Sequence, residues 1–238
     1  MRTLAGLQST LGGRASLEDE DIAAMRPQTR ARRIAVVLTE RAASPGLTVD
    51  DVVSLGRQPF TGWQGRLTAE DRDRVRAALD MTGAPQFAAR LFDDLSNGER
   101  QRVMIARAIA QSPRLMVLDK ITAFLDLAGR VEVMALLRAH ARATGAIILL
   151  SSHDLHLSLR LADSVWLLDG RGTLATARFT SPFPATVTTA RAVADQGATV
   201  TGTAPGMVVN TDAFGPSGRS SPTHSIMSAT PAPSSHIE

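Results

Sequence analysis

A short apolar run, Leu115–Leu118, is followed by Asp119 and then by Lys120, the only lysine in the chain. A carboxylate at the end of a buried strand is the kind of group that holds the magnesium ion of a nucleotide. The phosphate-binding P-loop has the pattern G-x-x-x-x-G-K-[ST], in which the lysine follows a glycine and precedes a hydroxyl residue. Lys120 lies between Asp119 and Ile121, so this pattern is absent from the 238 residues. The sequence therefore predicts the metal-binding carboxylate of a nucleotide-hydrolysing site, without the P-loop lysine that binds the phosphates.

A second polar group is the segment Leu95-Ser96-Asn97-Gly98-Glu99, which opens a predicted helix. A serine and a glycine at a helix start present backbone N–H groups, a hydroxyl and the positive end of the helix dipole to an anion. The same residues also fit an ordinary capping box, with Ser96 as N-cap and Glu99 three residues later. Taken alone, the segment is better explained as a cap.

The segments that would position these residues alternate between strand-like and helix-like patterns of apolar residues. Short apolar runs, typical of strands buried on both faces of a parallel sheet, lie at residues 34–38, 115–118, 146–150 and 165–168. Helical spacing of apolar residues predicts helices at about 98–111 and 128–144, and further helices at 48–55 and 68–82. This alternation predicts an α/β fold with a mostly parallel sheet.

The composition changes near residues 175–185. From Ala175 to Glu238 there is no leucine, tryptophan or lysine, and Thr, Ala, Ser, Pro and Gly dominate. Such a segment buries too little apolar surface to offset the entropy of ordering it. We therefore expect one domain over residues 1–178 and a low-complexity tail over 179–238, mostly disordered from about Thr186.

The overall composition narrows the function classes. The chain has no cysteine, which excludes disulfides, thiolate–zinc sites and cysteine nucleophiles and fits a reducing compartment. No apolar run approaches the roughly 20 residues of a membrane-spanning helix, so we expect any link to a membrane to go through a partner. The net charge is only +3, and the seven phenylalanines and two tryptophans are scattered, so nucleic acid is not an expected partner.

Taken together, the motifs resemble those of ABC-type ATPases. Residues 95–99 are similar to the signature loop, usually LSGGQ, and Asp119 resembles the Walker B aspartate. Thr122-Ala123-Phe124-Leu125-Asp126 is similar to the D-loop, and Ser151-Ser152-His153-Asp154 to the switch-histidine segment. The four motifs occur in the order of the family, and the resemblance covers about residues 1–175.

Upstream segments extend this resemblance. Residues 32–41 resemble the strand that leads into the Q-loop, with Glu40 where a glutamine is usual. Residues 47–62 are similar to the helical subdomain of the importer branch that serves iron chelates, haem and cobalamin, and we expect that subdomain over about 47–97. Residues 1–7 resemble the end of the helix after the P-loop, which implies a start just downstream of the phosphate site.

The resemblance implies a P-loop NTPase fold that lacks its P-loop strand, with ATP and Mg²⁺ as cofactors. It implies Asp119 and His153 as catalytic groups, Asp119 also as metal ligand, Asp126 in the D-loop, and Ser96, Asn97, Gly98 and Glu99 as nucleotide contacts. ABC ATPases work as head-to-tail dimers in which each ATP lies between the P-loop of one subunit and the signature of the other. The implied partners are transmembrane permease subunits and a second ATP-binding subunit, at the cytoplasmic face of the cell membrane.

Two adjacent residues depart from the family pattern. A glutamate that orients or deprotonates the attacking water usually follows the Walker B aspartate, but here Lys120 stands at that position. An ammonium with a pKa near ~10.4 cannot accept that proton at neutral pH, and losing a general base costs on the order of 10²–10⁴ in rate. Ile121 replaces the usual proline. We therefore expect the isolated chain to be inactive as an ATPase.

The resemblance also has a consequence for stability. It places the P-loop strand beside the Walker B strand, so its loss leaves backbone groups unpaired, at about 1–3 kcal/mol each. We therefore expect a marginally folded chain unless a partner or a rearranged strand fills the gap.

Four interpretations follow from these patterns. The leading one is a truncated, hydrolysis-impaired ATP-binding subunit that couples energy in an ABC importer of the iron-siderophore or haem type. The second is a non-catalytic interaction module that supplies its signature loop to an intact partner ATPase. The third is an ABC-type protein of nucleic-acid metabolism, against which the importer-like insert argues. The fourth is a fragment, or a wrong start in a gene whose product is ordinary, with the leucine-free tail as a result of the same damage.

Overall fold

The computed structural model describes all residues except 39–43, 169–172, 180–184, 192–198, 203–205 and 213–238. Its helices are α1 (Pro27–Arg33), α2 (Val49–Ser54), α3 (Ala69–Met81), α4 (Asn97–Ala110), α5 (Leu127–Thr144) and α6 (Leu155–Leu161), with short 3-10 turns η1 (Leu55–Arg57), η2 (Pro85–Phe87) and η3 (Phe92–Asp94). Its strands are β1 (Arg14–Leu17), β2 (Glu20–Asp21), β3 (Ile34–Val37), β4 (Leu115–Leu118), β5 (Ile147–Ser151), β6 (Ser164–Leu168), β7 (Thr173–Phe179), β8 (Ala185–Arg191), β9 (Thr199–Gly202) and β10 (Gly206–Asp212).

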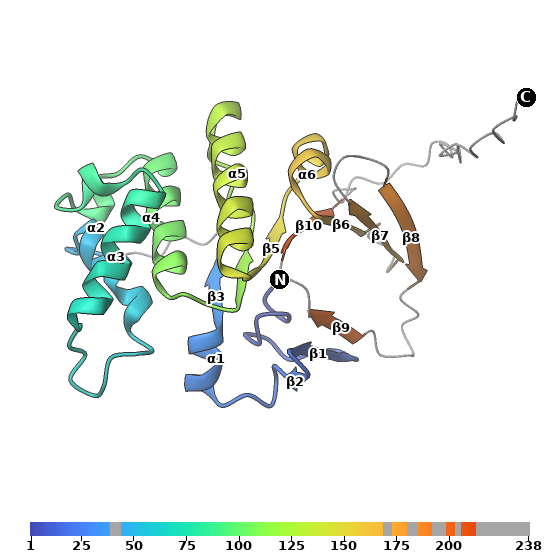
Figure 1. The fold of residues 1–238 in the computed structure, drawn as a ribbon, viewed down its shortest axis with the longest axis horizontal. Coiled ribbons are helices and arrows are strands. Elements are labelled where there is room, and N and C mark those ends of the chain that lie inside the picture. The colour runs from blue at the N-terminus through green and yellow to red at the C-terminus, as the bar shows by residue number, and fades with distance from the viewer. Residues whose placement is uncertain (39–43, 169–172, 180–184, 192–198, 203–205, 213–238) are drawn as a thin grey trace, which may run out of the picture.

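The strands form a main sheet in the order β3-β4-β5-β10-β6-β7-β8 (Figure 1). The first five strands of this order run parallel, while β7 and β8 are antiparallel additions at one edge. The predicted α/β fold with a mostly parallel sheet is confirmed. The four predicted helices are present as α2, α3, α4 and α5, with ends that differ by at most one residue.

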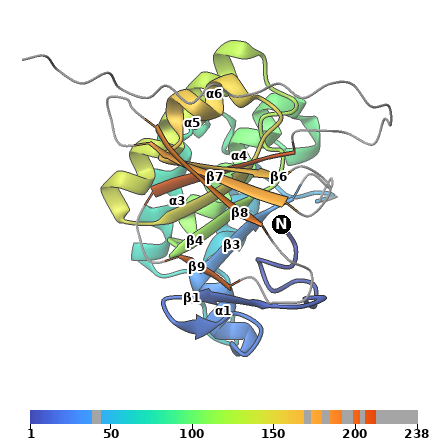
Figure 2. The same cartoon turned by 90° about the vertical axis from the view of Figure 1, so that its right-hand side faces the viewer.

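Two apolar cores lie on opposite faces of this sheet, because successive strand residues point to opposite faces. Met116 and Leu118 belong to the core that includes residues of α4 and α5. Leu115 and Val117 belong to a second core with residues of the N-terminal segment and of the β1–β2 hairpin. Figure 2 shows α5 and α6 on one side of the sheet and β1 and α1 on the other. All four β4 residues are buried, as the unbroken apolar run predicts.

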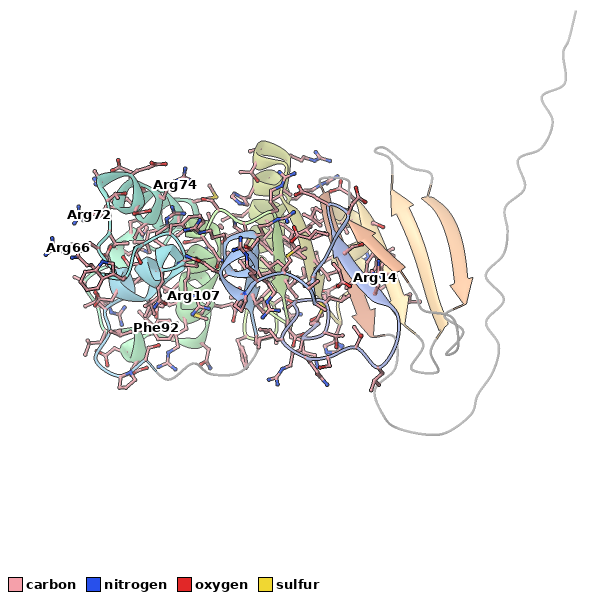
Figure 3. All side chains as sticks on the ribbon, turned by 90° about the horizontal axis from the view of Figure 1, so that it is seen from below. Arg14, Arg66, Arg72, Arg74, Phe92 and Arg107 are labelled. Carbon is pink, nitrogen blue, oxygen red and sulfur yellow. The ribbon has the colours of Figure 1, made fainter. Side chains whose placement is uncertain are left out.

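The helical insert, residues 49–81, packs against α4. Thr48 and Thr68 each form a capping box, with Asp51 and Asp71 as the third helical residue, so α2 and α3 both have satisfied N-termini. Figure 3 shows Arg107 on α4, beside this insert. The insert is therefore attached to the helix that carries the predicted signature loop at its start.

Parts of the expected tail form strands. The structure places residues 185–191, 199–202 and 206–212 in strands, whereas we expected mostly disorder from Thr186. The composition argument counted only apolar burial, while the backbone groups of neighbouring strands offer hydrogen bonds to a segment of any composition. The remainder of the expected tail, residues 180–184, 192–198, 203–205 and 213–238, lies outside the described residues.

We expected unpaired backbone groups beside the strand that ends at Asp119, which is β4, and this expectation is wrong. β4 is paired on both sides, with β3 and with β5. A strand from the C-terminal segment, β10, is inserted in the sheet between β5 and β6. A rearranged strand thus completes the sheet one position away from where we expected the vacancy.

Candidate functional site

Parallel pairing brings the ends of β4 and β5 to one edge of the sheet, and there Asp119 meets Ser151. The Ser151 hydroxyl donates to Asp119 Oδ1 at 2.6 Å and accepts from the Lys120 backbone N–H at 2.8 Å. The backbone N–H of Asp119 donates to the Val37 carbonyl at the end of β3, at 2.8 Å. Three adjacent strands therefore hold the Asp119 carboxylate in place.

Lys120 begins the turn that follows Asp119. Its φ of 51° is in the left-handed region, which costs a residue with a Cβ on the order of 1–3 kcal/mol. The Lys120 carbonyl accepts from the Ala123 N–H at 3.0 Å, and the turn leads directly to Ile121, which is only 1% exposed. Ile121 at the usual proline position thus serves as a core residue, and the bond from Ser151 helps to hold the strained Lys120 backbone.

The switch-histidine segment follows β5 at the same edge. His153 is exposed, while Ser151 and Ser152 are buried. Asp154 caps α6, because its carboxylate accepts from the Leu157 N–H at 3.0 Å and its own N–H donates to Ser152 Oγ at 3.0 Å. The imidazole therefore lies on an anchored turn, on the edge that also holds Asp119.

The D-loop residue Asp126 has a local role in the structure. Its carboxylate accepts from the Gly129 N–H at 2.8 Å and so caps α5. Arg130, one turn later, donates to the Leu125 carbonyl at 2.9 Å and reaches Asp154 at 3.9 Å. Arg130 thus links the D-loop to the switch-histidine segment. No motif in the sequence points to Arg130, and the switch-histidine resemblance, although it includes Ser151, did not indicate that the Ser151 hydroxyl bonds Asp119 and Lys120.

The predicted signature loop forms a separate polar group at the start of α4. Ser96 Oγ accepts from the Glu99 N–H at 3.3 Å, and the Ser96 N–H donates to Glu99 Oε2 at 2.7 Å, so the predicted capping box is confirmed. These bonds, first the one from the Ser96 backbone N–H, lower the pKa of Glu99. Ser96 and Asn97 are exposed, and a side chain built on Gly98 would lie 3.5 Å from Leu125 of the D-loop. The role of these residues in nucleotide contact stays a prediction.

The described residues include no group of three or more His, Cys, Asp and Glu side chains that could hold a metal by themselves. Mg²⁺ usually keeps several waters and takes one or two carboxylates together with substrate phosphates. A single fixed carboxylate such as Asp119 fits this kind of site, and its part as metal ligand stays a prediction. Glu40, the predicted Q-loop position, lies outside the described residues.

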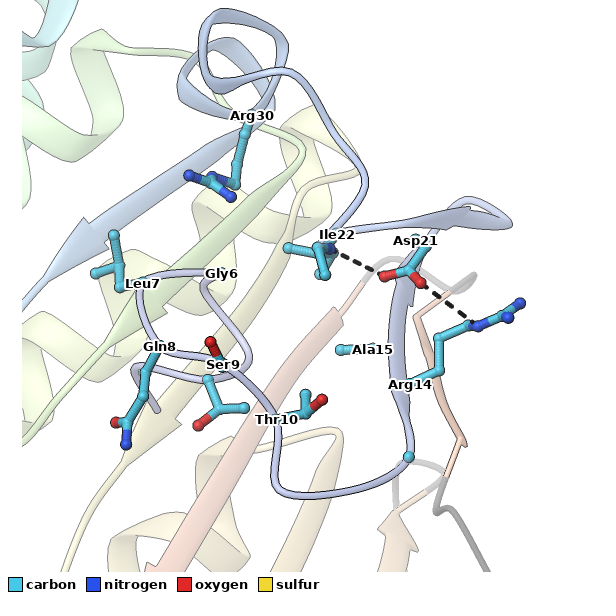
Figure 4. A pocket seen from close by; sticks show the side chains of 13 residues that line it. Gly6, Leu7, Gln8, Ser9, Thr10, Arg14, Ala15, Asp21, Ile22 and Arg30 are labelled. Carbon is cyan, nitrogen blue, oxygen red and sulfur yellow. Dashed lines mark hydrogen bonds and ion pairs between the residues drawn. The ribbon is translucent and has the colours of Figure 1, made fainter.

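A cavity of about 260 Å³ lies on the side of the sheet that carries the β1–β2 hairpin (Figure 4). The N-terminal segment, the hairpin and Arg30 line it, and Arg14 at its rim forms a 3.5 Å ion pair with Asp21. None of the predicted site residues lines this cavity.

Replacing Ser151 with alanine should destabilise the chain by about 1–3 kcal/mol, because the Asp119 carboxylate loses a donor and the Lys120 N–H loses its acceptor. Ser151→Thr keeps the hydroxyl and should recover most of this loss. Urea unfolding of the two variants beside the unchanged chain measures the difference. Equal losses in both would show that packing, and not the hydroxyl, matters at this position.

Comparison with known proteins places these motifs in a family. The sequence model of the ABC transporter family matches residues 1–123. The chain is 38% identical over 175 residues to the achromobactin transport ATP-binding protein of Dickeya dadantii, covering 74% of this chain and 65% of that protein. It is 36% identical over 162 residues to the iron(3+)-hydroxamate import ATP-binding protein of Bacillus subtilis, covering 68% and 60%.

A third relative is the cobalamin import ATP-binding protein of Halobacterium salinarum, 37% identical over 172 residues, with 72% of this chain and 43% of that protein covered. The chain thus spans less than two thirds of the length of these relatives. Within the part of the chain that the structure describes, no helix is long and apolar enough to cross a membrane.

Solved structures show the same fold. A metal-chelate type ABC transporter in an inward-facing conformation matches with a TM-score of 0.55 and 26% identity, over 67% of this chain and 59% of that one. A dimeric ABC transporter cassette matches with a TM-score of 0.60 and 23% identity, over 69% and 72%. Because the family model matches more than half of the residues, and because one relative is 38% identical over 74% of the chain, the chain belongs to the ABC transporter family, as a relative of its ATP-binding subunits.

Proposed function

We propose that this chain is the energy-coupling, ATP-binding subunit of an ABC importer, and that its own hydrolytic site is impaired. The observation that carries the proposal is the fixed Asp119 carboxylate, bonded to Ser151 at the shared edge of β4 and β5, with Lys120 next to it where the family has a glutamate.

The residues at this edge divide the chemistry among them. The Asp119 carboxylate would hold a Mg²⁺ ion, which when bound would supply positive charge to stabilise the phosphates of ATP. His153 is exposed at the same edge and can contact the terminal phosphate. Lys120 brings no carboxylate to the position where the family has the glutamate that orients or deprotonates the attacking water. The phosphate-binding loop must come from outside these 238 residues, because they contain no G-x-x-x-x-G-K-[ST] segment.

The transported substrate we propose is an iron chelate or a similar large metal complex, such as haem or cobalamin. The support is the similarity to relatives named for achromobactin transport, iron(3+)-hydroxamate import and cobalamin import. The proposed partners are permease subunits and a second ATP-binding subunit, which would place the chain at the cytoplasmic face of the membrane. Trp63 is 93% exposed in the loop between η1 and α3, and we further propose it as a permease contact.

A second candidate function is a non-catalytic module that completes the site of an intact partner subunit. The observation that favours it is the independence of the signature loop, whose capping bonds join Ser96 only to Glu99 and leave Ser96 and Asn97 exposed. In this case Ser96 is needed and Asp119 and Lys120 are not.

Purification of the tagged full chain from membranes in mild detergent tests the proposal. We expect permease subunits and an intact ATP-binding subunit to copurify, and Trp63→Ala to lose the permease. Recovery of the chain without any permease would contradict the importer assignment.

Mg-ATP hydrolysis by the purified complex then separates the two functions. If the site of this chain is used, Lys120→Glu should raise its rate on the order of 10²–10⁴ by restoring a general base, whereas Lys120→Met should not. If the chain is a module, both Lys120 variants leave the rate unchanged and only Ser96→Arg abolishes it. Ala143→Arg, at an exposed position on α5, is the control for the added charge.

A further inference from the structure

The strands β5 and β6 are consecutive along the core of the chain, connected by α6, yet they do not pair with each other. β10, from the C-terminal segment, lies between them and runs parallel to both. Gly206 to Asn210 pair with β5, and Val208 to Asp212 pair with β6. Figure 1 shows this strand in the middle of the sheet, between strands that come earlier in the chain.

A strand with neighbours on both sides satisfies the backbone groups of both. Without β10, β5 and β6 would each present a row of unpaired N–H and C=O groups in the interior of the sheet, where no water replaces them. The preceding strand β9 pairs with β1 in the smaller sheet, so the C-terminal segment contributes a strand to each of the two sheets. α5 packs over β10 as it packs over β5. The segment is thus an integral element, although its composition is that of a tail.

The register also connects β10 to the candidate site. Asn210 pairs with Ser151, the last residue of β5, and Ser151 is the residue that bonds Asp119 and the Lys120 backbone. Ser151 is therefore held by Asp119 and Lys120, which follow β4, on one side and by β10 on the other.

We propose that residues 206–212 are a docking strand, that the slot between β5 and β6 is its acceptor site, and that its insertion within the same chain positions the edge formed by Asp119 and Ser151. The occupant is this chain's own C-terminal segment. The proposal rests on the strand register and does not depend on the function proposed above.

Disulfide trapping tests the proposal directly, because the chain contains no cysteine. Val208 pairs with Ser164, and neighbouring strands about 4.7–4.9 Å apart lie within disulfide reach. In the full chain with Val208→Cys and Ser164→Cys, oxidised glutathione should produce a disulfide-linked monomer. The control with Thr211→Cys and Ser164→Cys is three residues out of register, roughly 10 Å along the strand, and should not close.

Absence of the bond, or equal closure in the control, would overturn the proposal. A disulfide-linked dimer would overturn it as well, because a second copy would then supply the strand. No nucleotide or permease is needed, so a failed importer assignment leaves this result unaffected.

Hydrogen exchange in the full chain is the second measurement. Val208→Pro removes one backbone donor from a strand that is paired on both sides, and exchange in β5 and β6 should rise on the order of tenfold. Val208→Thr keeps the donor and the β-branched shape and should leave exchange unchanged. Equal exchange in both variants would show that the slot does not depend on residues 206–212.

Discussion

Replacing Arg57 with methionine should destabilise the chain by about 3 kcal/mol, at the lower end of the range for breaking a buried ion pair. Arg57 and Asp71 have side chains that are each 7% exposed, and Arg57 Nε lies 2.8 Å from Asp71 Oδ1. The guanidinium also donates to the Ala110 carbonyl at 3.0 Å and lies 4.0 Å from the Phe60 ring. Methionine keeps the apolar stem but leaves Asp71 Oδ1 and the Ala110 carbonyl without this donor. We expect the lower end of the range for a broken buried ion pair because Thr68 still donates hydrogen bonds to Oδ2 of Asp71.

The loss should depend on pH. Hydrogen bonds from the Thr68 backbone first, then from the Thr68 side chain and Arg57, lower the pKa of Asp71 from 3.8 to about 2. A lowered pKa stabilises the fold above the unfolded value, and this contribution disappears as the pH falls through the folded value. The stability difference between the unchanged chain and Arg57→Met should therefore be full above about pH 4 and shrink as the pH falls toward 2.

Urea unfolding of both proteins between pH 7 and the acid limit measures these differences. The matched control is Arg76→Met, because Arg76 pairs with Asp73 in a setting where both side chains are 70% exposed. Its effect should be within about 0.5 kcal/mol. A loss for Arg57→Met no larger than that of the control would mean that the buried pair contributes nothing net.

Gly56→Ala should destabilise the chain by about 1–3 kcal/mol, the usual cost of overpacking. A Cβ built on Gly56 would overlap the Arg107 carbonyl oxygen of α4, a backbone atom that cannot rotate away. Alanine is otherwise preferred over glycine in helical turns by roughly 1 kcal/mol. The clash with the Arg107 carbonyl outweighs this preference, so the net change in stability should be a loss. The shift should also loosen the contact between the helical insert and α4, whose first residues follow the signature serine.

The control is Gly62→Ala, because a Cβ at that glycine meets no atom within 4 Å. Thermal unfolding should show a lower midpoint for Gly56→Ala and an equal or slightly higher one for Gly62→Ala. A stabilised Gly56→Ala would mean that α4 moves aside at little cost and that the close packing at η1 is not a constraint.

Local patterns were enough to predict much of the fold. The apolar run before Asp119 is β4, the helical spacing gives α4 and α5, and the Ser96 and Glu99 pair forms the expected capping box. These features depend on residues within a few positions of one another, so their spacing carries the information. Motif order along the chain carried the family assignment in the same way.

Contacts between distant residues were beyond such patterns. Ser151 meets Asp119 from 32 positions away, and Arg57 reaches Ala110 across 53 positions. The resemblances covered both Ser151 and Arg57, but they did not indicate these contacts, because the partners lie far away along the chain.

The amino-acid sequence by itself determined the strand and helix periods, the order of the motifs and the ammonium at position 120 in place of a general base. Only the tertiary structure decided which strand completes the sheet and what holds Asp119. The physical reason is that β10 is recruited through its backbone N–H and C=O groups, which every residue in it carries whatever its side chain. A segment read as a tail from its composition thereby becomes a central strand.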